Sequence, residues 1–237
     1  MRKYKKVIGG IIFLFLLLII ILAIAYFLDQ AQIRKVYIVS PKPVYRGLNI
    51  LNDKNLFIFP EEQTEEYLKR ENIEVKTVSF EKIFPNSLII HLTLRRPSAI
   101  IETSSGKLVI DQEAKVLPVA VDNLNLPIIA ASANLFLDEE KIDWRIVKAL
   151  SLLDNSSKQG ILVDRISIDG DKTIFQVYLS DGAEIIIPAE SDMAQIAASL
   201  QIIISRFRIE GKIISKIDYQ FDKPTIIFGS GKVSSSQ

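Results

Sequence analysis

The longest run of apolar positions lies near the start of the chain, over residues 7–28. It contains no charge, while four basic side chains precede it and Asp29 follows it. Because each helical residue adds ~1.5 Å, the run would measure about 33 Å as a helix and could cross a hydrocarbon core of about 30 Å. The pattern therefore predicts one transmembrane helix over residues 7–28, after a short basic tail over residues 1–6.

The charges on either side of this run predict its direction in the membrane. Because basic residues stay on the cytoplasmic side, we expect a cytoplasmic N-terminus and an extracytoplasmic domain over residues 29–237. A cleaved signal peptide is the alternative, since residues 23–25 (AIA) have the small-x-small spacing of a cleavage site. The apolar run continues past that site over residues 26–28, which favours a retained single-pass anchor. Both interpretations place the working part of the chain outside the cytoplasm.

The stretch after the anchor shows strand-like and helix-like patterns in turn. Residues 33–39 (IRKVYIV) are rich in β-branched side chains and predict a strand, as do residues 75–83. Residues 61–72 carry acid–base pairs four apart, which predicts a helix. Residues 88–94 alternate, with Leu and Ile on one side and His91 on the other. We therefore expect His91 to be an exposed strand residue rather than a catalytic base.

Beyond Arg95 the chain changes to short strands separated by turns. The proline of the Arg95-Arg96-Pro97 sequence cannot donate to a sheet ladder, so this sequence ends the preceding strand and predicts a joint between domains. Apolar stripes at helical spacing predict helices over residues 142–153 and 192–208. Asp181-Gly182 predicts a tight hairpin turn between two strands.

Together these elements predict an α+β protein in which a membrane anchor precedes two domains. The domains are expected over residues 29–96 and 97–228, the second being a mixed β domain with two helices. Its last strands are predicted over residues 213–221 and 225–228, before a flexible polar tail over residues 229–237.

Composition limits the chemistry that the chain can perform. With no Cys and one His, thiolate catalysis and His/Cys zinc sites lack their side chains, and a Ser-His-Asp triad would need His91. Without the four N-terminal basic residues, 25 basic side chains remain against 28 acidic ones, a net charge of about −3. Nucleic-acid binding needs a basic surface. We therefore expect no nucleic-acid partner.

Three short motifs imitate a penicillin-binding serine transpeptidase: residues 104–107 (S-x-x-K), 132–134 (S-x-N) and 172–174 (close to K-T-G). The serine and lysine of such a site need the start of a helix, whereas residues 104–107 predict a hairpin turn. Residues 229–232 lack the first glycine and the final Ser/Thr of a phosphate loop. Asp169, Asp171 and Asp181 lack EF-hand spacing. We expect no enzyme activity, cofactor, metal or small-molecule substrate.

Four segments of the chain, taken in order, resemble the FtsQ/DivIB family of bacterial cell-division proteins. They are FPNSLIIHLTLRRPSAII (residues 84–101), LVIDQEAKVLP (108–118), NLPII (125–129) and ISKIDYQF (214–221). Three departures accompany them. The Glu of the family's Glu-Arg-x-Pro motif is absent at Arg95-Arg96-Pro97. Ser40-Pro41 stands where the family has a glycine after the first strand, and residues 44–57 show only a weak helical pattern for the first helix.

The resemblance implies a fold and a function. Residues 29–96 would be a POTRA domain (β-α-α-β-β), and residues 97–228 a β domain whose terminal strands bind partners. The protein would be a non-catalytic scaffold of the divisome in the cell inner or plasma membrane, at the division septum. Its partners would be single-span coiled-coil proteins of the FtsL and FtsB type and other divisome membrane proteins. The alternative is a POTRA-containing assembly or secretion factor unrelated to septation.

Within the β domain, the resemblance points to the last strand as the partner-binding site. Its candidate residues are Phe221, Thr225, Ile226, Ile227 and Phe228. Pro224 is tolerated only at an edge, so the strand could offer unpaired backbone groups to an extended partner segment. The alternative is that Ile226, Ile227 and Phe228 only complete the core.

Overall fold

The computed structural model describes residues 2–42, 45–104, 106–121, 124–131, 136–138, 141–168, 173–221 and 223–229. The chain divides into two units, Met1–Arg95 and Arg96–Gln237. This division falls one residue before the boundary expected from the sequence. Beyond Gly229, the expected polar tail lies outside the described residues.

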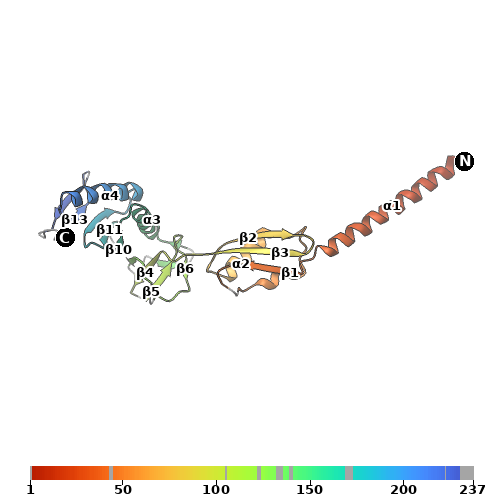
Figure 1. Cartoon of the computed structure of the whole chain (residues 1–237), viewed down its shortest axis with the longest axis horizontal. Helices are drawn as coiled ribbons and strands as arrows, with labels where there is room; N and C mark the ends of the chain where they lie inside the picture. Colours follow the sequence, from red (N-terminus) through yellow and green to blue (C-terminus); the bar gives the residue numbers. More distant parts are fainter. Residues whose placement is uncertain are drawn as a thin grey trace. The chain divides into compact units, whose positions relative to one another are not determined.

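The N-terminal helix α1 (Arg2–Gln30) takes in the whole apolar run (Figure 1). It begins at Arg2, so the basic residues expected as a separate tail form its first turns. Its segment Phe13–Gln30 is long and apolar enough to cross a membrane, and large apolar side chains such as Phe15 and Leu22 are exposed along it. In the part of the chain that the structure describes, α1 is the one helix suited to be a single-pass anchor.

The rest of the first unit is a three-stranded sheet with a helix packed against it. β1 (Lys35–Val39), β2 (Val75–Ile83) and β3 (Ser87–Leu94) lie in the order β1-β3-β2, with β1 parallel and β2 antiparallel to β3. Helix α2 (Glu61–Glu71) contributes Leu68 to the core. The alternation along β3 behaves as predicted, because its even-numbered Leu and Ile residues face this core while His91 is exposed.

The first helix implied by the β-α-α-β-β pattern is reduced to a 3₁₀ turn, η1 (Leu48–Leu51). Gly47 precedes it with φ 80°, a left-handed conformation that does not continue into a regular helix start. Asn52 and Asp53 follow it, and such side chains compete with helical hydrogen bonds. The structure thus has a 3₁₀ turn where the resemblance implies the first helix, in agreement with the weak helical pattern over residues 44–57.

The second unit is built on one mixed sheet of nine strands. These are β4 (Ala99–Thr103), β5 (Gly106–Ile110), β6 (Val116–Leu117), β7 (Ile128–Ala131), β10 (Val163–Ile168), β11 (Ile174–Leu179), β12 (Glu184–Pro188), β13 (Ile214–Asp218) and β14 (Thr225–Phe228). Their order is β14-β13-β12-β11-β10-β7-β4-β5-β6. A separate small hairpin joins β8 (Phe136–Asp138) and β9 (Lys141–Ile142).

Helices α3 (Trp144–Lys158) and α4 (Met193–Ile209) pack together and bury apolar side chains against the sheet (Figure 1). Helix α3 begins two residues later than predicted, because the Asp143 side chain accepts a hydrogen bond from Arg145 N and caps it. Asp192 caps α4 in the same way. Alternate side chains of the central strands face away from this core, so the sheet has a helix-covered face and an open face. At β4, β5 and β6 the open face is partly covered by a small cluster around Ile100, Val109 and Leu117.

Candidate partner-binding edge

Strand β14 forms one edge of the nine-stranded sheet. It pairs with β13 in antiparallel register, with Thr225 opposite Asp218, Ile226 opposite Ile217 and Ile227 opposite Lys216. Among the described strands, none pairs with its outer side. β14 therefore has an outer row of backbone groups that a further strand could use.

The direction of these backbone groups follows from one hydrogen bond. Gly229 donates its N–H to the carbonyl oxygen of Ile213 at 2.9 Å, so at Gly229 the backbone faces inward. Along an antiparallel strand, successive residues turn their backbone groups to opposite sides. The N–H and C=O groups of Ile226 and Phe228 therefore face outward, away from β13.

The side chains of β14 divide between the two faces of the sheet. Ile226 packs against the core beside buried Ile217, and the Phe228 ring stacks edge-on against Phe207 of α4, with centroids 4.9 Å apart. Thr225 and Ile227 alternate with them and lie on the open face, where Ile227 is 53% exposed. The strand thus contributes partly to the core and keeps an apolar side chain in solvent.

The end of β14 carries a compact charged group. Lys212 Nζ lies 5.5 Å from the Phe207 ring centroid and 5.4 Å from that of Phe228. Glu210 lies 2.8 Å from Lys212 Nζ and 3.3 Å from Arg206 Nε. The hydrogen bond from Lys212, and secondarily the one from Arg206, holds the pKa of the Glu210 carboxyl below its usual value. The Lys212 ammonium thus lies between the aromatic pair and Glu210.

Phe221 lies in the turn between β13 and β14 and is 65% exposed. Two residues earlier, Tyr219 turns inward and donates its hydroxyl hydrogen to Ser199 Oγ of α4 at 3.0 Å. Burial raises the pKa of Tyr219 above its ordinary value. Because Tyr219 is held against α4, Phe221 is presented to solvent next to the edge strand.

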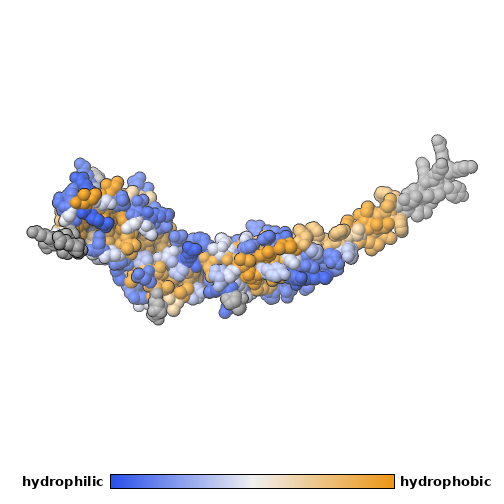
Figure 2. Space-filling model, viewed as in Figure 1, coloured by the Kyte–Doolittle hydropathy of each residue, from blue (hydrophilic) through white to orange (hydrophobic). Residues whose placement is uncertain are grey.

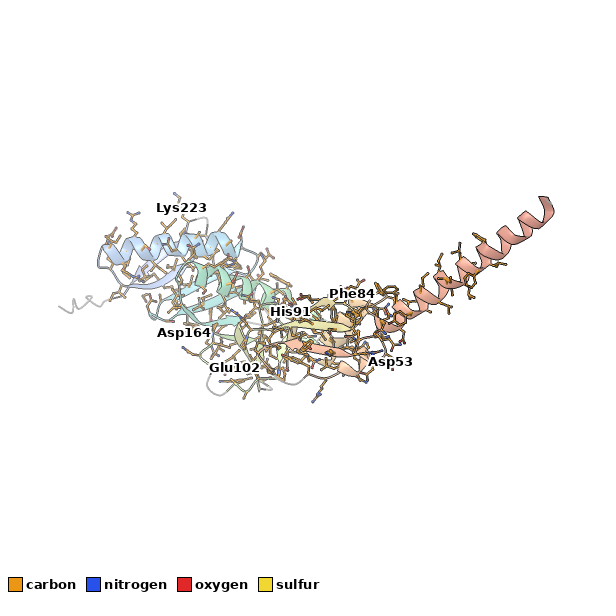
Figure 3. The ribbon with its side chains drawn as sticks, turned by 45° about the vertical axis from the view of Figure 1, so that its right-hand side comes forward. Asp53, Phe84, His91, Glu102, Asp164 and Lys223 are labelled. Atoms are coloured by element: carbon orange, nitrogen blue, oxygen red, sulfur yellow. The ribbon has the colours of Figure 1, made fainter. Side chains whose placement is uncertain are left out.

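Sequence reasoning missed a hollow of about 600 Å³ on the second unit, with Glu102, Arg165, Gln176 and Ile186 among its lining residues. Glu102, labelled in Figure 3, lies 3.1 Å from Lys107 Nζ and 2.7 Å from Arg165 Nη2. Both hydrogen bonds, that of Lys107 more strongly, lower the pKa of Glu102. Glu102, Arg165 and Gln176, polar residues at strand positions, were the signal in the sequence that could have indicated this hollow. The sequence did not show that strands distant along the chain bring them together.

The motifs weighed for catalysis do not assemble in the described part of the chain. Ser104 lies in the turn between β4 and β5, and Lys107 is paired with Glu102, so S-x-x-K does not start a helix. Residues 132–134 and Lys172 lie outside the described residues, as do Asp169 and Asp171. Asp181 accepts a hydrogen bond from Ala183 N within its turn.

Comparison with known proteins identifies the first unit. A family model described as "POTRA domain, FtsQ-type" matches residues 28–95, which comprise β1, η1, α2, β2 and β3. The chain thus contains an apolar N-terminal helix followed by an FtsQ-type POTRA domain. This arrangement is consistent with an FtsQ/DivIB-like protein, and the match agrees with the resemblance noted in the sequence. No curated protein matches the chain.

Proposed function

We propose that this protein is a non-catalytic scaffold of the divisome, which binds partners through strand β14 outside the cytoplasm. The FtsQ-type POTRA domain supports a cell-division role. The observation that best supports this binding site is the position of β14 at the sheet edge, where its outer side pairs with no other described strand. Single-span partners of the FtsL and FtsB type, whose exported segments can be extended beside a strand, fit this edge.

Binding would proceed by addition of a partner strand to the sheet. The outward backbone groups of Ile226 and Phe228 would pair with the partner, each net hydrogen bond contributing roughly 0.5–1.5 kcal/mol. Exposed side chains add specificity, because Ile227 and Phe221 offer apolar contacts at the strand and at the turn before it. The proposal thus uses four of the five candidate residues, Ile226 and Phe228 mainly through their backbone, while Thr225 lies beside Ile227 on the open face.

A substitution at Ile227 tests this site. We expect Ile227→Glu in the full-length protein to weaken binding to the exported segments of FtsL/FtsB-type proteins from the same genome by about tenfold or more, since it places a charge in an apolar contact. Affinity is measured by biolayer interferometry with the protein in nanodiscs. Ile202→Glu is the matched control, because Ile202 is 66% exposed on α4, and it should bind like the unsubstituted protein. Equal binding by all three proteins would remove β14 as the site.

The POTRA domain itself favours a second candidate function. Strand β1 is an edge of its sheet and exposes Val36, Tyr37 and Val39, so it could receive client segments of an assembly or secretion pathway. Imaging of a fluorescent fusion separates the two functions. A scaffold of the divisome concentrates at the septum, whereas an assembly factor unrelated to septation is distributed around the membrane.

A further inference from the structure

Four large apolar side chains are exposed together at one end of the POTRA domain. Phe57 and Ile58 follow η1 and are 55% and 77% exposed; Ile83 and Phe84 lie at the turn between β2 and β3 and are 43% and 53% exposed. The rings of Phe57 and Phe84 lie 4.9 Å apart between centroids, so the two segments form one surface, which we name the junction patch.

Hydrogen bonds to backbone carbonyl groups place this patch beside the end of α1. Asn55 Nδ2 donates to the carbonyl oxygen of Leu28 at 2.5 Å, and Leu56 N donates to that of Ala31 at 2.9 Å. Phe57 and Ile58 follow these two residues directly in the chain. On the other segment, Arg34 N donates to Asn86 O at 2.9 Å, which ties the turn that holds Phe84 to the residues just after α1.

The depth of α1 in a membrane would set the depth of the patch. The polar headgroup region adds roughly 5–8 Å to each side of the hydrocarbon core. Leu28 ends the apolar run, so the loop bonded to it lies at the height of this region. In Figure 2, hydrophobic colour covers the coloured part of α1 and recurs on the POTRA domain near the end of α1, and Figure 3 shows Phe84 at that end. Aromatic rings prefer this layer of a bilayer.

The charges next to the patch are of both signs. Arg34 and Lys35 are exposed after α1, while Asp29 follows the apolar run and exposed Asp53 lies on the loop before Asn55. Such a mixture gives no strong attraction to an anionic surface. The contact that the patch can make is therefore apolar, and it does not require acidic lipids.

We propose that the POTRA domain rests on the outer surface of the bilayer through the junction patch, with Phe57, Ile58, Ile83 and Phe84 inserted among the lipid headgroups. This rests on the proposed anchoring of the chain by α1. The occupant is the lipid that surrounds the anchor, because the hydrogen bonds to Leu28 and Ala31 hold the patch where that lipid begins. The contact would fix the tilt of the domain relative to the membrane.

Tryptophan fluorescence in vesicles tests the contact with the full chain. Trp144 is the single tryptophan, so a Trp144→Phe background lets one new indole report its own surroundings. Phe84→Trp and Ile58→Trp probe the patch. Thr77→Trp is the matched control, because Thr77 is also exposed on β2 but lies six residues, or about 20 Å, before Ile83. Leu18→Trp in α1 verifies the anchor separately. Each protein is reconstituted into phosphatidylcholine vesicles with or without brominated acyl chains.

We expect brominated lipid to reduce the emission of both patch probes by about twofold or more, and that of Thr77→Trp little. Quenching of Leu18→Trp without quenching of either patch probe would overturn the proposal and leave the patch to a protein partner. Equal quenching at Thr77 would also overturn it, because the domain would then lie on another face. Failure at Leu18→Trp would instead disprove the anchor. Circular dichroism confirms that each variant is folded.

Discussion

At the scale of single residues, Asp143 decides where α3 begins. Its Oδ1 accepts from Arg145 N at 2.8 Å, and Arg145 Nη2 lies 3.0 Å from Oδ2, so one carboxylate caps the helix and pairs with a cation. The Arg145 side-chain hydrogen bonds are the largest influence that holds the pKa of Asp143 below its usual value. The ionised form is therefore favoured by folding.

We expect Asp143→Ala to lower the free energy of unfolding of the β domain by about 1–2 kcal/mol, the usual cost of a lost cap. The pKa of Asp143 is lower in the folded state than in the unfolded state. The ionised carboxylate therefore adds to the free energy of unfolding above about pH 4, and this contribution is lost as the pH falls through the folded pKa. Urea unfolding between pH 2 and 7, followed by the fluorescence of adjacent Trp144, measures both effects. Asp143→Asn keeps a cap oxygen, so it should cost less at pH 7; a cost equal to that of alanine would contradict the capping role.

At the scale of elements, Gly47 explains why the first helical element of the POTRA domain is a 3₁₀ turn. Its φ of +80° is left-handed, and a Cβ built there would lie 2.8 Å from Cε1 of Tyr67 on α2. Asn72, after α2, accepts from Arg46 N and donates to Arg46 O, which fixes the same segment against the helix. Position 47 thus requires a glycine for two reasons: the left-handed backbone conformation, and the close approach of the Tyr67 ring.

Gly47→Ala should destabilise the POTRA domain by about 2–4 kcal/mol, the sum of left-handed backbone strain and overpacking against Tyr67. Gly211→Ala is the matched control, because Gly211 has φ +67° with open space around it, and it should cost about 1 kcal/mol in its own domain. Hydrogen exchange read by mass spectrometry gives the loss of protection in each domain. Equal losses would show that the contact with Tyr67 costs nothing.

Local patterns in the sequence predicted most elements but not their neighbours. Strand β2 has the predicted bounds, and α4 begins within one residue of its predicted start at Asp192, because alternation and helical spacing depend on residues close along the chain. The parallel pairing of β7 with both β4 and β10 could not be predicted, since nothing in one strand specifies a distant partner. The edge position of β14 was predicted with the help of Pro224. The junction patch could be recognised only in the structure, from the hydrogen bonds that Leu28 and Ala31 accept.

At the scale of the whole molecule, the hydrophobic clusters keep to one unit each. The cluster around Leu68 and Ile90 draws only on the POTRA domain, whereas the cluster around Ile166 and Phe175 draws only on the β domain. Each domain thus has a core of its own, which is the condition for separate folding.

A cavity in one core should therefore act on one domain. Leu68→Ala, at a side chain 2% exposed, is expected to cost the POTRA domain about 2–5 kcal/mol. The unfolding transition of the β domain, followed by Trp144 fluorescence, should keep its midpoint in urea. A shift of that midpoint would show that the two domains unfold as one cooperative unit.

The attachment of β14 has a consequence for the kinetics of binding. β14 joins the sheet through a short local hairpin with β13, whereas central strands such as β7 pair with strands far away in the sequence. Its side chains bury little, so opening of this hairpin costs less than unfolding of the sheet. In the proposed complex, a partner strand added outside β14 would be lost whenever β14 itself detached. The residence time of such a partner would then be limited by the opening rate of the hairpin, and substitutions that tighten Phe228 against Phe207 would prolong the complex without touching the partner.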